Sequence, residues 1–112
     1  MNSVFKNMTA SEPIHLADLV DVRSGEVASR TLAQTPKGNV TLFAFSQGEA
    51  ISSHVSDGDA LITVLTGKAQ ITVGGKVSVV EAGQSILMPA GIPHAVDALE
   101  DFKMLLLVLF PE

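Results

Sequence analysis

The stretch GQSILMPAGIPHAVDA, from Gly83 to Ala98, decides how the chain is predicted to fold. It contains a short apolar run at Ser85–Met88 and an alternating run that begins at His94. Between them lies the segment PAGIP (89–93), whose two prolines have no N–H to donate to a sheet ladder. The stretch therefore predicts two short strands joined by a tight connection, with a histidine opening the second strand.

The same strand pattern recurs on both sides of this stretch, whereas helical periodicity is scarce. Asn39–Ser46 is largely apolar at both odd and even positions, so one of its faces is predicted to look into a closed interior. Ala60–Val73 is broken at Gly67 and is followed, after Gly74-Gly75, by another run; together they predict a meander of three strands. The last predicted strand is Lys103–Phe110.

The N-terminal part is more ambiguous. Ile14–Val22 is compatible with a strand or with one helical turn followed by a strand, and Val27–Gln34 alternates weakly. The chain thus has nine or ten predicted strands and no Pro/Gly/Ser-rich linker. We predict an all-β fold, a jelly-roll β-barrel, since closing or doubling a sheet removes exposed edges. One domain spans 1–112, with N-terminal strands in 1–38 and the barrel in 40–110.

Composition narrows the classes of partner. The chain has 112 residues, which suits one domain, and its net charge of -5 disfavours nucleic acid and anionic membranes. It has no cysteine, so thiolate chemistry and disulfides are excluded. The first residues do not form a signal peptide, and the longest apolar run, Met104–Phe110, is too short to span a membrane. We expect a cytoplasmic protein with no membrane partner.

Two Gly-led segments place a histidine beside turn residues, and here the sequence resembles the cupin family. The family's second motif is G, five residues, PxG, two residues, H, three residues, N. Gly83, Pro89, Gly91 and His94 match it, whereas Ala98 replaces the asparagine. This resemblance covers roughly residues 40–110 and implies the jelly-roll barrel.

The first cupin motif is only partly retained. Gly48, His54 and Gly67 occupy their motif positions, but Ser56 replaces the second histidine and Ala60 replaces the glutamate. In the family those two residues complete a cage of three histidines and one carboxylate around a metal ion. The resemblance leaves His54 and His94 as metal ligands, so we predict no firmly held cofactor and at most weak binding of Zn, Ni or Cu.

Other polar residues near the motifs are weaker candidates. Asp57 and Asp59 fit a turn better than a replacement carboxylate, and their odd positions point away from the face that His54 shares with Ser56. Asp97 is three positions from His94, so its side chain is likewise predicted to point to the opposite face of the strand. Ser56 and Gln84 are polar enough for a distant ligand role.

An apolar interior with few polar groups is typical of a site for a small molecule. We predict that such a ligand contacts His54, Ser56, His94, Phe43, Phe45 and Met88; for the apolar members, as for Met104 and Leu106, filling of the barrel is the alternative. Two functions stay open. The chain binds a small, aromatic or aliphatic molecule without a catalytic metal, or it is a metal-dependent oxygenase or isomerase whose two-histidine site is completed by water or substrate.

We also expect a homodimer. A small closed sheet leaves strand edges unpaired, and Ile14–Val22 is more apolar than a barrel of this length needs. Similarity to small cupins points to pairing through N-terminal strands and one sheet face.

Overall fold

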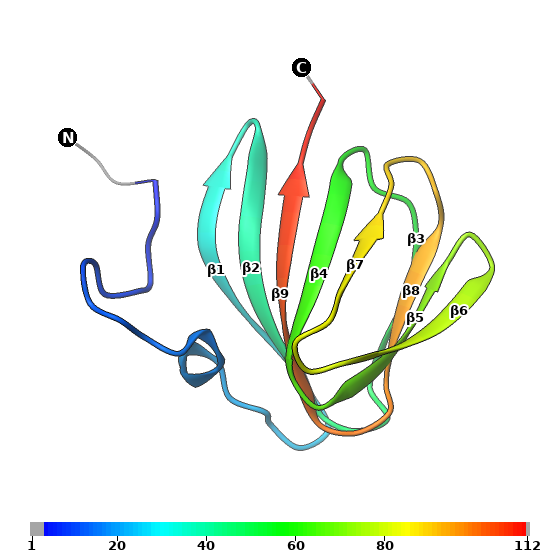
Figure 1. Cartoon of the computed structure of the whole chain (residues 1–112), viewed down its shortest axis with the longest axis horizontal. Coiled ribbons are helices and arrows are strands. Elements are labelled where there is room, and N and C mark those ends of the chain that lie inside the picture. The colour runs from blue at the N-terminus through cyan, green and yellow to red at the C-terminus, as the bar shows by residue number, and fades with distance from the viewer. Residues whose placement is uncertain (1–3, 112) are drawn as a thin grey trace.

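The structure, a computed structural model, describes residues 4–111. Within that range the chain forms nine strands and one short 3₁₀ helix, η1 (Leu16–Leu19) (Figure 1). The strands are β1 (Val27–Thr35), β2 (Gly38–Phe45), β3 (Ala50–His54), β4 (Asp59–Thr66), β5 (Lys68–Val73), β6 (Lys76–Glu81), β7 (Ser85–Met88), β8 (His94–Ala98) and β9 (Phe102–Leu109). No helix in residues 4–111 is long and apolar enough to cross a bilayer.

The strands form two antiparallel sheets that face each other. One sheet has the order β1-β2-β9-β4-β7 and the other the order β3-β8-β5-β6. β9 inserts between β2 and β4, and β8 inserts between β3 and β5, so strands far apart in sequence become neighbours. This connectivity is that of the predicted jelly-roll barrel.

The predicted three-strand meander is wrong in its first half. β5 and β6 pair as expected, but β4 pairs with β7 and β9 in the opposite sheet. The chain crosses between sheets at Gly67, where φ is +78° and a side chain would collide with the carbonyl oxygen of Asp101. Glycine at this position therefore permits a change of sheet, not a hairpin turn.

The main core lies between the two sheets. Its largest buried side chains include Phe45 and Phe102, whose rings stack with centroids 4.5 Å apart. Val64 and Ile71, from opposite sheets, are also fully buried. The odd positions of β2 face this core, as the sequence predicted for one face of the strand.

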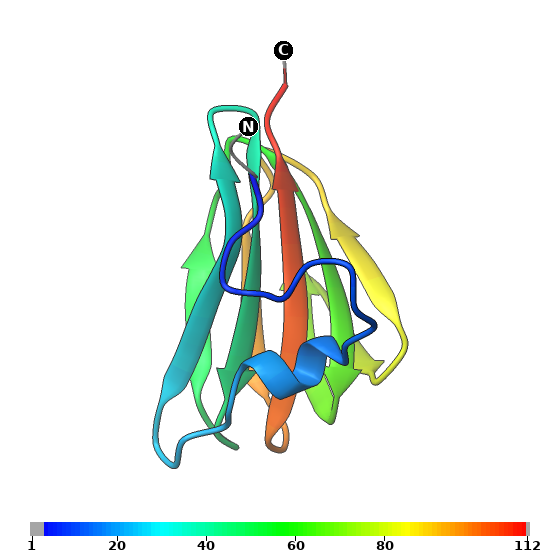
Figure 2. The ribbon, with the colours of Figure 1, turned by 90° about the vertical axis from the view of Figure 1, so that its left-hand side faces the viewer.

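A second core explains why the other face of β2 is also apolar. Leu32, Leu42 and Ala44 are buried beneath Val20 and the partly buried Leu16 and Leu19. Figure 2 shows the N-terminal segment and η1 lying across the outer face of the five-stranded sheet. The sheet is thus covered on both faces over much of its length.

The prediction of N-terminal strands is confirmed for Val27–Gln34, which lies within β1, and wrong for Ile14–Val22. Residues 4–26 contain η1 and one isolated bridge, between Phe5 and Ala33, but no strand; β1 follows from Val27. In Ile14–Val22 the helical-turn alternative is correct, but the strand expected after the turn does not form. Residues 1–3 of the predicted N-terminal part lie outside the described residues.

Candidate functional site

A cavity of about 150 Å³ lies between the sheets at the end of the barrel where β3 ends and β8 begins. Within residues 4–111, nine of its twelve lining residues are apolar and three are polar. The apolar ones are Phe43, Ile51, Ala60, Ile62, Met88, Val96, Met104, Leu106 and Val108; the polar ones are His54, Ser56 and His94. Such a cavity, apolar with a few convergent polar groups, is typical of a small-ligand site.

The two histidines meet at this cavity although 40 positions separate them in sequence. They are cross-strand partners on β3 and β8, and their Nε2 atoms are 3.0 Å apart. The rings meet edge to face, with an interplanar angle of 69°. His94 is only 3% exposed, whereas His54 is exposed at the rim.

The other ring nitrogen of each histidine contacts the backbone. Nδ1 of His54 lies 3.1 Å from the carbonyl oxygen of Ser52, and Nδ1 of His94 lies 3.2 Å from that of Ile92. A carbonyl oxygen only accepts, so each of these contacts is a hydrogen bond when Nδ1 carries a proton, and the 3.0 Å contact between the two Nε2 atoms is one when either of them carries a proton. Burial lowers the pKa of His94, the hydrogen bond to Ile92 offsets part of this shift, and nearby His54 lowers the pKa again.

Local turns hold the rim of the cavity in place. The hydroxyl oxygen of Ser56 accepts the N–H of Gly58 at 3.1 Å, and the Ser56 carbonyl accepts the N–H of Gly91 at 2.9 Å. The carboxylate of Asp59 accepts the N–H of Ala90 at 2.8 Å. These contacts tie the β3–β4 connection to the PAGIP turn before His94.

The structure therefore brings most of the predicted site residues together. His54, Ser56, His94, Phe43 and Met88 all line the cavity. Phe45 does not line it, because its ring is fully buried against Phe102 deeper between the sheets.

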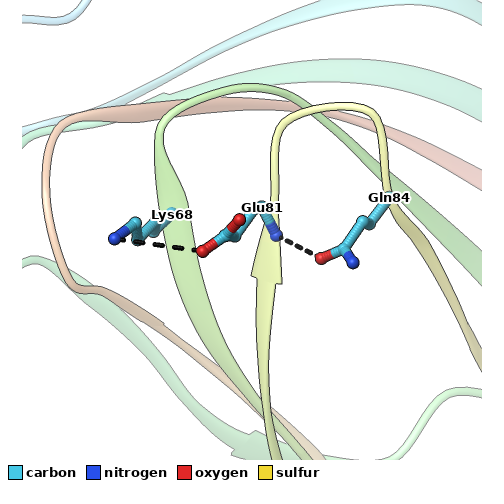
Figure 3. A network of polar contacts seen from close by, with 3 residues as sticks. All are labelled: Lys68, Glu81 and Gln84. Atoms are coloured by element: carbon cyan, nitrogen blue, oxygen red, sulfur yellow. Dashed lines mark hydrogen bonds and ion pairs between the residues drawn. The ribbon is translucent and has the colours of Figure 1, made fainter.

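The weaker polar candidates lie elsewhere. Asp59 is used as a turn anchor, and neither it nor Asp57 lines the cavity. Gln84 lies in the β6–β7 turn, where its side-chain oxygen accepts the N–H of Glu81 at 2.9 Å (Figure 3). In that turn Glu81 also approaches Lys68 at 3.9 Å, an exposed ion pair of little energetic weight.

The alternation of side chains along a strand did not predict Ile51 as a lining residue. Ile51 and His54 are three positions apart, which would place them on opposite faces of a regular strand. A register shift between these two residues in the β3–β8 pairing brings both to the cavity. On β8 and β9, side-chain alternation does identify the lining residues. His94 and Val96 share one face of β8, and Met104, Leu106 and Val108 share one face of β9.

The donor set does not fit the four-ligand metal centre of the resemblance. Among residues 4–111, no three His, Cys, Asp or Glu side chains converge as a metal site would require. Ser56 and Ala60 line the cavity at the positions where the motif has its second histidine and glutamate, and neither offers a strong ligand. Among the lining residues that the structure describes, only the imidazoles of His54 and His94 can supply nitrogen ligands to a metal.

Comparison with known proteins agrees with the fold and the motifs. The sequence matches the Cupin domain family over residues 41–110. A conserved protein of unknown function from Streptococcus pyogenes is 40% identical, with a TM-score of 0.96 and alignment over 99% of this chain and 97% of that one. A cupin superfamily protein from Desulfitobacterium hafniense is 32% identical, with a TM-score of 0.92 over 97% and 100% of the two chains.

Two other comparisons add less. A cupin 2 conserved barrel domain protein from Leptotrichia buccalis is 40% identical over 86% of this chain and 47% of that chain, with a TM-score of 0.83. No curated protein sequence matches this chain. With its family match over most of its length and close structural relatives, the chain belongs to the cupin family.

Proposed function

We propose that this protein binds a small, largely apolar molecule in the cavity between its sheets, without a tightly held catalytic metal. The observation that carries the proposal is the cavity itself: about 150 Å³, with apolar walls and a histidine pair at its polar end. An apolar cavity of about this size accommodates one benzene ring. The replacement of two motif ligands by Ser56 and Ala60 supports a role that does not depend on metal.

Binding of ring-sized probes tests this function. In protein dialysed against EDTA, titration with benzene or phenol is expected to shift the methyl resonances of Met88 and Met104 saturably, because both side chains line the cavity. Ala60→Met, which projects a longer side chain into the cavity, is expected to abolish the shifts. Val79→Met, at a side chain 54% exposed on β6, is the matched control and should bind normally.

Failure of both probes to give a saturable shift would overturn the proposed function. Mass spectrometry of the small molecules extracted from freshly purified protein complements the titration, since a ligand that co-purifies identifies the natural occupant.

A metal-dependent reaction, as an oxygenase or isomerase with a two-histidine site, is the second candidate. The observation in its favour is the 3.0 Å separation of the two Nε2 atoms. Two ligands that each lie about 2.1 Å from one ion and are about 90° apart have this separation. Elemental analysis separates the candidates: about one equivalent of metal that survives EDTA, and is lost in His54→Ala, favours the second.

A further inference from the structure

Three side chains in the walls of the cavity interact more favourably with an aromatic ring than with an aliphatic group. These are Phe43, Met88 and Met104. Aromatic rings attract one another in offset and edge-to-face arrangements, beyond the effect of the area that they bury. The sulfur of methionine also makes favourable contacts with aromatic rings, often at the ring edge. The walls thus distinguish between kinds of apolar molecule.

Phe43 is the outermost of three aromatic side chains that form a continuous series. Its ring centroid lies 6.2 Å from that of Phe45, at an interplanar angle of 44°, and Phe45 stacks on Phe102 at 4.5 Å. Phe45 and Phe102 are fully buried, whereas Phe43 is partly buried and lines the cavity. An aromatic ring in the cavity would extend this series by one member.

The two methionines reach the cavity from different strands. Met104 on β9 is the cross-strand partner of Phe43, whereas Met88 on β7 is the partner of Ala60 on β4, the strand that separates β7 from β9. Met88 is 2% exposed and Met104 is 1% exposed, and both line the cavity. A bound ring can therefore meet a thioether at two places on its edge.

Ala60 contributes to the shape of the space. It lies between Val108 and Met88 in one cross-strand row of the five-stranded sheet, and its side chain is the shortest of the three. A hollow made by one short side chain, between sheets that pack about 10 Å apart, is shallow in the direction that separates the sheets. Such a space suits a flat ring better than a puckered one.

We propose that the ligand presents an aromatic ring to this cavity, with the ring next to Phe43 and its edge against the sulfur atoms of Met88 and Met104. A saturated ring or an aliphatic chain would bury a similar apolar area but would not gain these contacts. This inference rests on the proposed function and adds the class of ligand to it.

The test compares benzene with cyclohexane by calorimetric titration of EDTA-treated protein. Cyclohexane is the more apolar ring, so burial of apolar area alone favours it. Benzene is nevertheless expected to bind about tenfold more tightly, because only benzene has a π system for the aromatic and thioether groups to contact.

Removal of the sulfur atoms assigns the preference to the walls. Biosynthetic incorporation of norleucine replaces each methionine sulfur with a methylene group and keeps the side chain unbranched. The ratio of cyclohexane to benzene dissociation constants should then fall about fivefold. Met88→Leu combined with Met104→Leu conserves volume and should lower the ratio as well, which locates the effect in the cavity. Met8→Leu is the matched control: Met8 packs against the second core, outside the cavity, so the ratio should not change.

The outcomes separate this inference from the proposed function. Equal or tighter binding of cyclohexane to the unchanged protein would overturn the aromatic class, while binding of an apolar molecule stands. A ratio that keeps its native value in the norleucine protein or in the double Leu variant would overturn it in the same way. If benzene and phenol both fail to bind, the proposed function falls together with the inference.

Discussion

The two cavity histidines differ in environment although their rings touch. His54 lies at the exposed rim, whereas His94 is 3% exposed and has a lowered pKa. The folded protein therefore favours the neutral form of His94 to a lower pH than the unfolded chain does. This difference links the protonation of one side chain to the stability of the fold.

Acidification is expected to destabilise the protein through His94. The unfolded chain binds this proton near the ordinary pKa of 6.5, whereas the folded protein binds it only at lower pH. The free energy of unfolding should therefore fall as pH drops below 6.5, until the folded-state pKa is passed. Urea unfolding of the native protein and His94→Gln, from about pH 8 to about pH 5, measures the effect.

His94→Gln should lose less stability across this range than the native protein, whereas His15→Gln, at an exposed site, should behave as the native protein does. Parallel losses in the native protein and His94→Gln would show that the decline arises from other groups.

The metal prediction also belongs to the residue scale. Protein purified without a nickel-affinity step is expected to retain no stoichiometric metal after dialysis against EDTA, because two imidazoles chelate weakly. Restoring the motif ligands with Ser56→His and Ala60→Glu should raise zinc affinity steeply, since both positions line the same cavity as His54 and His94.

Elemental analysis and calorimetric zinc titration measure both expectations, and Ser56→His alone serves as an intermediate. About one equivalent of Fe, Mn or Zn retained by the unchanged protein would contradict the first expectation.

At the scale of elements, two glycines with similar backbone conformations have different structural roles. Gly67 and Gly75 have φ of +78° and +87°, a conformation that L residues rarely adopt. A Cβ at Gly75 would meet nothing within 4 Å, whereas one at Gly67 would collide with Asp101 and Phe102. The crossing between sheets thus depends on close packing as well as on backbone conformation.

Gly67→Ala is accordingly expected to destabilise the protein more than Gly75→Ala. The backbone conformation alone costs about 1–2 kcal/mol for alanine, and overpacking adds about 1–3 kcal/mol at Gly67. Chemical denaturation of the two variants measures the difference. Equal losses would mean that the contacts at Gly67 relax without cost.

The core strands give a second prediction at this scale. Ile71 on β5 is fully buried between the sheets, so Ile71→Ala should lower the free energy of unfolding by about 2–5 kcal/mol through lost burial and a residual cavity. Val79→Ala on the adjacent β6, at a side chain 54% exposed, should change it by less than about 0.5 kcal/mol. A comparable loss at both positions, measured by urea unfolding, would contradict this division of core from surface.

At the scale of the whole molecule, the apolar side chains of the N-terminal segment do not need a second protein to bury them. Leu16, Leu19, Val20 and Val22 pack on the chain's own five-stranded sheet. Other exposed apolar side chains of that sheet, Leu61 and Leu87 among them, do not take part in this packing. Leu107, Leu61 and Leu87 are successive cross-strand neighbours on β9, β4 and β7, and they form what we term the leucine row.

The leucine row is the surface through which we expect the homodimer to form. Leu87 is 58% exposed and Leu61 is 38% exposed, and a second copy would bring the same uncharged row against it. Sedimentation equilibrium should give a mass near twice 11.7 kDa. Leu61→Glu combined with Leu87→Glu should yield monomers, whereas Val77→Glu, on β6 of the other sheet, should not.

A mass of 11.7 kDa for the unchanged protein would contradict the dimer itself. Persistence of the dimer in the double Leu variant would contradict only its placement on the leucine row.

Most of the strands could be predicted from the sequence because alternation and turn residues are local signals. The glycine and proline spacing around His54 and His94 also identified the family, and with it the expectation that the two histidines share a pocket. Local signals do not specify which strands pair in a sheet, however. For this reason β4 was predicted to belong to a meander, although its partners are β7 and β9. Nor could alternation anticipate the register shift that turns Ile51 toward the cavity.

By itself the sequence determined the all-β class and the absence of thiol chemistry, since these follow from short-range periodicity and residue identity. Its resemblance to the cupin motifs implied that Ser56 and Ala60 replace two metal ligands. Only the tertiary structure decided which apolar side chains became walls and which became core: Phe43 lines the cavity, while Phe45, two positions further along the same face of β2, is sealed against Phe102. The reason is that strand periodicity specifies a face, whereas the depth of a side chain along the barrel depends on the strands that pack opposite it.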